Sequence, residues 1–188
     1  MQKTTLFLLC FIASISFTQT TDKEQPTNSK KFFIGLGIGA GTLHLRANDT
    51  SQTTFSTTIP NIKVGYRFNN RFALLALLPG ANYKYHHKDR GFEAFILAGQ
   101  WWVTPKWWLL GGSGLTFDAP AFYTVKDPKT AGFYTGAPAF TFATGYEIIK
   151  IKHCSIDLQY RLFYGKSHIQ NNGTREGIAN MFILGFNW

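Results

Sequence analysis

The chain has 188 residues, of which 45% are hydrophobic, 16% aromatic and only 15% charged, and its formal net charge is +9. Intrinsic disorder is excluded, because disordered chains combine low hydrophobicity with a high proportion of charge, and this composition is the reverse. The length favours one domain with a sizeable core.

Residues 1–18 have the organisation of a secretory signal peptide. Lys3 lies in a short polar start, residues 6–13 form an apolar run, and small and polar residues follow as far as Thr18. This order predicts export and cleavage near Thr18. The apolar run is too short for a membrane anchor. Residues 19–31 are polar and patternless, which predicts a flexible periplasmic leader.

After the leader, apolar and polar residues alternate with a period of two, which is the pattern of β-strands. In the second of eight such segments, Ile62 and Val64 point one way and Lys63 the other. The third contains Pro79, which predicts a bulge or bend, and the pattern of the fourth assigns no inward face. The eight segments are residues 34–41, 61–68, 72–85, 92–103, 107–117, 139–148, 156–164 and 178–188.

Short and long connections alternate strictly between these segments. An up-and-down meander places alternate turns at opposite ends, and bacterial outer-membrane barrels have short periplasmic turns and longer extracellular loops. The pattern predicts an all-β fold, a closed antiparallel eight-stranded up-and-down transmembrane β-barrel over residues 32–188. The short connections are 69–71, 104–106 and 150–153, and the long ones are 47–58, 86–91, 118–136 and 165–177.

The two sides of the predicted strands differ in chemistry. One side carries glycines and charges of both signs, whereas the other is aliphatic and aromatic. A soluble barrel would enclose a ligand with its apolar side. However, an eight-stranded barrel is only wide enough inside for side chains, so we place the apolar side against lipid. The expected inner polar network consists of Lys63, Arg67, Asp157, Gln159 and Arg161.

This network has two interpretations, a narrow conductive path and a plug of paired charges. Opposite charges in a narrow lumen attract and neutralise one another, which favours the plug. A wide aqueous pore is disfavoured on size, because such channels need about 16 strands.

Tryptophans gather at the end of the barrel where the connections are short. Amphipathic rings collect at membrane–water interfaces, so this grouping predicts an aromatic girdle. The predicted members are Trp101, Trp102, Trp107, Trp108 and Trp188.

The export signal, the eight alternating strands and the C-terminal sequence 182–188, which ends on Trp188, together resemble a family. They are similar to the small outer-membrane β-barrels of the OmpA/OmpX-like, porin-family type. The resemblance implies a location in the Gram-negative outer membrane, with membrane lipids and lipopolysaccharide as partners. It also implies insertion by the barrel-assembly machinery.

The longest predicted connection, residues 118–136, mixes aromatic rings with cations. Long loops on a rigid scaffold commonly carry function. The leading hypothesis is a structural or surface-interaction role through extracellular loops, with an unknown ligand. Two alternatives stay open, a lipid-modifying enzyme and a narrow channel or carrier for a small hydrophobic molecule. The loop binding candidates are Phe122, Tyr123, Lys126 and Lys129.

No catalytic residue, metal site or cofactor is predicted. Ser167 and His168 are adjacent, so on a strand they point to opposite faces and do not form a dyad. His86 and His87 lack the ligand spacing of a known metal site. The cations are scattered and the chain is exported, which disfavours nucleic acid and favours anionic surfaces such as lipopolysaccharide phosphates.

Overall fold

The computed structural model describes residues 32–47, 50–58, 61–121, 131–151, 154–169 and 173–188. The predicted signal peptide and leader, residues 1–31, lie outside these ranges. No helix among the described residues is long and apolar enough to cross a membrane.

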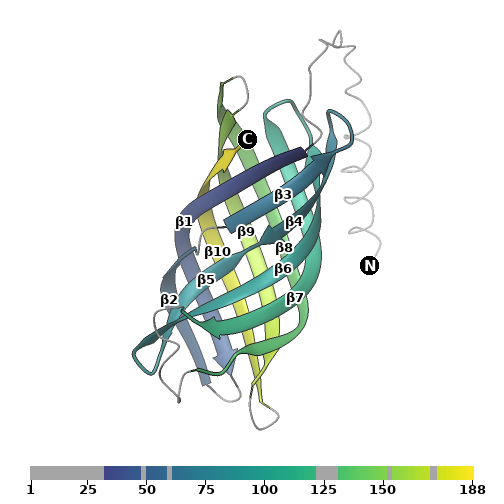
Figure 1. Cartoon of the computed structure of the whole chain (residues 1–188). Helices are drawn as coiled ribbons and strands as arrows, with labels where there is room; N and C mark the ends of the chain where they lie inside the picture. The colour runs from purple at the N-terminus through teal and green to yellow at the C-terminus, as the bar shows by residue number, and fades with distance from the viewer. Residues whose placement is uncertain (1–31, 48–49, 59–60, 122–130, 152–153, 170–172) are drawn as a thin grey trace, which may run out of the picture.

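Ten strands form one closed antiparallel sheet (Figure 1). The last strand pairs with the first, for example Ile38 with Leu184, and this pairing closes the ring. The ring has eight positions, because β2 and β3 both pair with β1, and β4 and β5 both pair with β6. The predicted closed eight-stranded barrel is therefore confirmed. The strands are β1 (Phe32–Ala47), β2 (Thr50–Thr57), β3 (Asn61–Arg67), β4 (Phe72–Leu78), β5 (Gly80–Tyr85), β6 (Lys88–Trp102), β7 (Trp107–Pro120), β8 (Tyr134–Ile151), β9 (Cys154–His168) and β10 (Thr174–Asn187).

The two ends of the barrel differ, and we call them the short-turn end and the hairpin end. The short-turn end, at the top of Figure 1, holds the start of β1, the end of β10 and the facing ends of β3 and β4, of β6 and β7, and of β8 and β9. The hairpin end, at the bottom, holds the facing ends of β1 and β2, of β5 and β6, of β7 and β8, and of β9 and β10.

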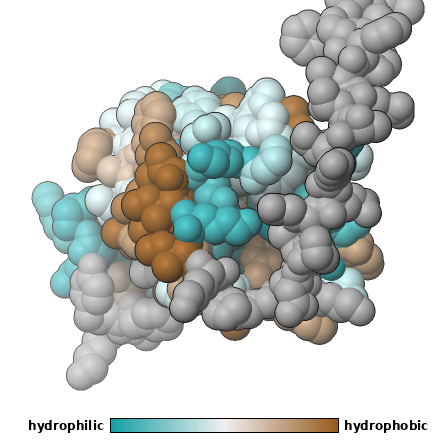
Figure 2. Space-filling view, turned by 90° about the horizontal axis from the view of Figure 1, so that it is seen from above, coloured by the Kyte–Doolittle hydropathy of each residue, from teal (hydrophilic) through white to brown (hydrophobic). Residues whose placement is uncertain are grey.

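Side chains alternate between the lumen and the outer surface as predicted. In β9, Leu158 is 54% exposed while Gln159 is 2% exposed, and in β10 Phe182 is 63% exposed while Ile183 is 1% exposed. Figure 2, seen from the short-turn end, shows hydrophobic residues gathered beside hydrophilic ones. We call the exposed apolar surface the apolar belt; its members include Ile34, Leu36, Ile38, Val64, Leu74, Leu97, Leu109, Phe142, Leu158 and Phe182.

The lumen is filled by packed side chains. Phe92, Ile96 and Phe163 belong to one buried cluster inside the ring, which also settles the inward face of β6. Gly145 on β8 makes room for a large side chain, because a Cβ at this position would overlap the indole of Trp108. The barrel interior is therefore a core in the ordinary sense.

The predicted bounds of the four long connections are wrong, because the strands extend further into them than predicted. Residues 50–57, placed in the first long connection, form β2, and β6 begins at Lys88 within the second. β7 continues to Pro120, and β8 begins at Tyr134. The third and fourth long connections are therefore shorter than predicted as well. In β2 the outward residues Ser51, Thr53 and Thr57 are polar whereas Phe55 is apolar, so the period-two hydrophobic signal is weak there although the backbone pairing continues.

The wall of the barrel has a seam between β2 and β5, which lie beside each other without a backbone ladder between them. Among the described residues, side chains make the connection instead. The Ser56 Oγ donates to the Asn82 carbonyl oxygen at 2.7 Å, and the Asn82 Nδ2 donates to the Thr57 Oγ at 3.1 Å. An open edge is costly in hydrocarbon, so a seam fits the polar hairpin end.

Candidate functional site

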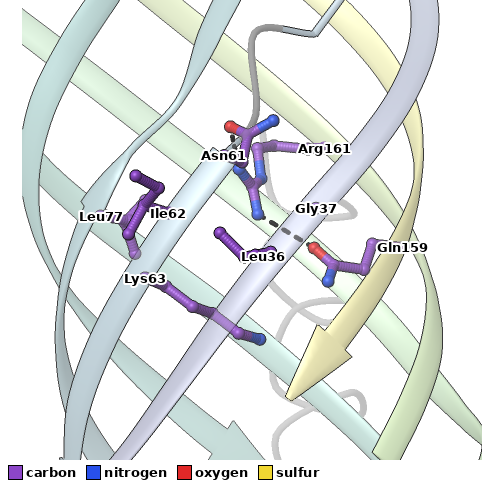
Figure 3. A pocket seen from close by; sticks show the side chains of 8 residues that line it. All are labelled: Leu36, Gly37, Asn61, Ile62, Lys63, Leu77, Gln159 and Arg161. Carbon is purple, nitrogen blue, oxygen red and sulfur yellow. Dashed lines mark hydrogen bonds between the residues drawn. The ribbon is translucent and has the colours of Figure 1, made fainter. Parts of the chain in front are cut away.

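Two polar clusters lie inside the barrel, one toward each end. The first, the turn-end network, consists of Asn61, Lys63, Asp157, Gln159 and Arg161, all buried. Figure 3 shows its members other than Asp157. β3 and β9 present these side chains to the lumen because they occupy the inward positions of the alternation. Four of the five belong to the predicted inner polar network, and Asn61 was not predicted.

Hydrogen bonds join the members of the turn-end network across the lumen. The Arg161 guanidinium donates to the Asn61 Oδ1 at 2.8 Å and to the Gln159 Oε1 at 2.9 Å. The Gln159 Nε2 donates to the Asp157 Oδ1 at 2.6 Å, and the Lys63 Nζ lies 3.9 Å from the Asp157 Oδ2. The network therefore links opposite walls of the barrel.

Arg67, the fifth predicted member, has a different environment. Its side chain is half-buried, and its guanidinium carbon lies 3.9 Å from the ring centroid of Trp102. A cation over the face of an indole is attracted by the ring quadrupole. The structure thus places Arg67 against an aromatic ring, nearer the short-turn end than the other four predicted residues.

The second cluster, the hairpin-end network, consists of Tyr83, Arg90, Asp118 and Arg175. The Arg90 Nε donates to the Asp118 Oδ1 at 2.8 Å, and Arg175 donates to the Asp118 Oδ2. The Tyr83 hydroxyl lies 2.9 Å from both carboxylate oxygens. The side chains of Arg90 and Asp118 are 1% and 0% exposed. One buried carboxylate therefore holds two buried cations.

Further contacts complete the hairpin-end network. The second terminal nitrogen of Arg90 donates to the carbonyl oxygens of Asp118 and Gly132, at 3.0 and 2.7 Å. The Tyr85 ring lies 4.9 Å from the Arg175 guanidinium carbon. The Tyr83 hydroxyl donates to the Asp118 carboxylate and accepts from Arg90 at 3.2 Å and from Arg175 at 2.7 Å.

Sequence reasoning did not identify the hairpin-end network. Arg90, Asp118 and Arg175 all fall in segments predicted to be connections. A usable signal was present, because Arg90 shares the inward parity of Phe92, and Arg175 shares that of Ala179. Extending the alternation past the apolar belt identifies both positions.

No protein-family model and no curated protein matches the chain. Among solved structures, Ail of Yersinia pestis in complex with the heparin analogue sucrose octasulfate is 12% identical, with a TM-score of 0.51 over 85% of this chain and 100% of that chain. Neisserial surface protein A is 18% identical, with a TM-score of 0.53 over 84% of this chain and 96% of that chain. The chain has the fold of the small outer-membrane β-barrels. At these identities the likeness concerns the fold alone.

The aromatic residues of this outer-membrane-type barrel form two groups. Trp101, Trp107 and Trp188 are 51%, 41% and 46% exposed, as a girdle requires. Trp102 and Trp108 are 8% and 2% exposed and point into the lumen, so their assignment to the girdle is wrong. The reason is that side chains alternate between the two faces of a strand. Trp102 directly follows the outward Trp101, and Trp108 directly follows the outward Trp107, so both point inward.

Outward-facing rings, some exposed and some half-buried, contact one another from neighbouring strands near the short-turn end. Phe32 and Tyr66 have ring centroids 4.8 Å apart, and Tyr66 and Phe68 have centroids 5.0 Å apart. Phe72 continues the series, with centroids 6.0 Å from Phe68 and 6.4 Å from Trp101. The aromatic surface is therefore continuous over β1, β3, β4 and β6.

The polar residues at the hairpin end do not form a catalytic arrangement among the described residues. Ser167 is fully buried and its Oγ donates to the Arg175 carbonyl oxygen at 3.4 Å, whereas His168 is exposed. The predicted opposite orientation of this pair is confirmed. His86 and His87 form the β5–β6 turn with positive φ angles of 48° and 61°. Within the described ranges, no three His, Cys, Asp or Glu side chains are placed to hold a metal.

The predicted loop binding candidates, Phe122, Tyr123, Lys126 and Lys129, lie outside the described residues.

Proposed function

We propose that this chain is an outer-membrane barrel with a structural and surface-interaction role. Residues 1–18 direct export, the short turns face the periplasm and the hairpins face the outside of the cell. The apolar belt and the likeness of fold support this placement, because exposed side chains of this kind are stable only against hydrocarbon. Trp101, Trp107 and Trp188 then form the girdle at the periplasmic interface.

The observation that carries the proposal is the filled lumen. The turn-end network and the hairpin-end network cross the barrel at two levels, and Phe92, Ile96 and Phe163 belong to the apolar cluster inside it. The cavity beside the turn-end network measures about 10 Å³. That is about the space of one water-sized sphere. The filled lumen therefore favours the plug interpretation over conduction. We infer that a partner binds to the outer surface of the barrel and its loops, because the lumen has no room for one.

Cations at the hairpin end point away from the lumen. Arg46 on β1 and Lys84 on β5 are exposed on outward positions just beyond the apolar belt, and Lys88 is exposed beside the β5–β6 turn. In the outer leaflet this is the level of the lipid headgroups. We propose that these side chains contact the phosphates of lipopolysaccharide. The attraction between a cation and a phosphate is electrostatic and requires no specific shape of the binding surface.

The C-terminal strand has a further role in this proposal. β10 pairs with β1 and closes the ring, and its outward residues include Phe182, Phe186 and the neighbouring Trp188. The barrel-assembly machinery reads such a strand in the proteins that the sequence resembles, and we propose the same partner here.

Photo-crosslinking in Gram-negative cells tests both the orientation and the partner. A photoreactive residue at Arg46 is expected to capture lipopolysaccharide, and the matched control at Lys106, exposed in the opposite turn, is expected to capture none. Capture at Lys106 but not at Arg46 contradicts the orientation. Capture at neither position contradicts the contact with lipopolysaccharide.

Planar bilayers test the lumen separately. The refolded barrel is expected to show no conductance steps above the bare membrane. Steps that disappear on Arg161→Ala would contradict the plug and restore the channel alternative.

A further inference from the structure

The outer surface of the barrel has an open cleft in its short-turn half, which we call the outer cleft. Its volume is about 660 Å³, and clefts that bind small molecules usually measure about 300–1,000 Å³. The cleft crosses from β7 to β10 on the side of the strands that carries the apolar belt. Its walls are formed by Trp107, Thr144, Tyr146, Leu158, Tyr160 and Phe182.

The cleft is hollow because a small residue lies among large ones. Thr144 on β8 is half-buried and lies directly opposite Tyr160 on β9, and in the next outward row Trp107 lies opposite Tyr146. Tyr146 and Phe182 are 51% and 63% exposed, so they rise above Thr144 on either side. The threonine therefore forms a low point between aromatic walls.

Hydrogen bonds fix the wall at Trp107. The Trp107 backbone N–H donates to the Thr104 Oγ at 3.0 Å, and the indole Nε1 donates to the Thr144 Oγ at 2.7 Å. The Thr144 hydroxyl donates in turn to the Trp108 carbonyl oxygen at 3.2 Å. A tryptophan in a girdle usually directs its indole N–H toward water and headgroups. Here the N–H is bonded to the barrel, so the ring is a fixed side of the cleft.

The opposite wall is fixed in a similar way. The Tyr160 hydroxyl donates to the Asn180 Oδ1 at 3.2 Å, and the Tyr160 ring centroid lies 5.1 Å from that of Phe182. The Tyr160 side chain is therefore held by contacts at its hydroxyl and along its ring. Walls that are already ordered reduce the conformational entropy that a ligand must remove on binding.

A cation lies beside the apolar walls. Thr104 and Trp107 both line the cleft, and Lys106 is exposed between them in the β6–β7 turn. Within the described ranges Lys106 forms no ion pair, and the nearby Glu147 carboxylate lies 3.9 Å from the Lys150 ammonium instead. The site thus offers a positive charge at the turn and an apolar surface beyond it, which matches a lipid with a phosphate headgroup.

We propose that the outer cleft binds one acyl chain of a glycerophospholipid, with its phosphate beside Lys106. A chain in a cleft has protein on several sides, whereas a chain on the convex wall has protein on one side, so it gains more dispersion contacts in the cleft. The choice of phospholipid over lipopolysaccharide rests on the proposed function, which places the short turns at the periplasmic leaflet.

Native mass spectrometry in detergent tests the cleft. The unaltered barrel is titrated with phosphatidylglycerol, and a first adduct of one lipid per barrel is expected to saturate before further lipids add. Adducts that follow only a statistical distribution would overturn the proposal. A dimer that forms in place of the lipid adduct would also overturn it, because a second copy would then cover the cleft.

The outcome in detergent does not depend on the orientation of the barrel in a membrane. Its failure would therefore leave the proposed function intact. Conversely, capture of lipopolysaccharide by a photoreactive residue at Lys106 would contradict the orientation and the choice of phospholipid, even if the cleft binds an acyl chain in detergent.

Filling the cleft tests its location. Thr144→Phe is expected to weaken binding of the first lipid about tenfold, the effect of losing contact with about two methylene groups. The matched control is Ser113→Phe, which adds the same ring at an exposed outward position of β7 outside the cleft and is expected to bind as the unaltered barrel does. Equal affinities in the two variants would refute the location. If Thr144→Phe does not fold, the titration of the unaltered barrel still decides.

Removing the cation tests the position of the phosphate. The unaltered barrel is expected to prefer phosphatidylglycerol over diacylglycerol with the same chains. Lys106→Gln is expected to reduce this preference about two- to fivefold, the effect of one exposed charge pair, and to leave the affinity for diacylglycerol unchanged. The control Lys88→Gln, exposed at the hairpin end, is expected to keep the preference. An unchanged preference in Lys106→Gln would contradict the placement of the phosphate.

Discussion

Replacing Asp118 with alanine is the sharpest test of the hairpin-end network. The side chain is 0% exposed and accepts from Tyr83, Arg90 and Arg175. Its removal leaves two arginine charges in the lumen without the carboxylate that holds them. Breaking a buried ion pair from one side costs about 3–5 kcal/mol. We expect Asp118→Ala to lower the free energy of unfolding by about that amount.

Two further variants separate charge from shape. Asp118→Asn keeps the volume and one acceptor oxygen but removes the negative charge, so its cost is expected to lie between zero and that of the alanine variant. Adding Arg175→Met to Asp118→Ala removes one of the stranded cations. The double variant is expected to be more stable than the sum of the two single changes by about 0.5–3 kcal/mol.

The assay is equilibrium unfolding in urea of the barrel folded in lipid vesicles, followed by tryptophan fluorescence and by gel mobility. Coincident transitions allow the free energies to be compared. The matched control is Asp89→Ala, because Asp89 pairs with Lys84 at 2.7 Å but on the surface. An exposed pair contributes about 0–1 kcal/mol. If Asp118→Ala costs no more than Asp89→Ala, the network does not stabilise the barrel as described.

Two other substitutions test the packing and the seam. Gly145→Val is expected to cost about 1–3 kcal/mol by overpacking against Trp108, while Gly111→Ala, whose Cβ would meet only the Phe142 ring at 3.4 Å, is expected to be tolerated in the same urea assay. Equal costs for the two glycines would contradict the lumen packing. Ser56→Ala removes the 2.7 Å bond to the Asn82 carbonyl and is expected to cost about 1 kcal/mol and to speed amide exchange in β2 but not in β9. Unchanged exchange in β2 would show that this bond does not hold the seam.

The sequence predicted the ring, because lipid imposes a strict alternation on the outward face. Residues such as Leu158 and Phe182 must be apolar, so each strand within the belt carries a strong period-two signal. Where most outward residues are polar, the signal weakens, and the sequence predicts a connection at residues 50–57 although β2 continues the sheet there.

The turn-end network was largely predictable for the same reason, since Lys63, Asp157 and Arg161 lie on the side of the strands opposite the aliphatic and aromatic residues. Their partners were not predictable, because contacts across the lumen join strands far apart in the chain. Asn61 and Arg161, for example, are 100 residues apart. The stacking of Arg67 on Trp102 depends on the same three-dimensional arrangement.

The two inward tryptophans show a different limit. The grouping of four tryptophans within residues 101–108 predicts a girdle at the membrane interface. However, adjacent residues on a strand point to opposite faces, so Trp101 and Trp102 cannot both face lipid. The inward face of β6 was ambiguous in the sequence, because the polar residues Glu93 and Gln100 fall on opposite parities. The structure resolves the ambiguity through the register with β7, which pairs Trp102 with Trp108.

A spin-label scan along β9 tests the central claim, that the apolar stripes face lipid and the polar stripes face the lumen. The barrel is prepared without residues 1–18, which contain Cys10, and its remaining natural thiol is removed by Cys154→Ser. Single cysteines then replace residues 158–162 in turn, and collisions with dissolved oxygen are measured in vesicles. Oxygen concentrates in hydrocarbon, so high accessibility is expected at Leu158, Tyr160 and Leu162, with low values at Gln159 and Arg161. The reverse pattern, or a profile without alternation, would contradict the account.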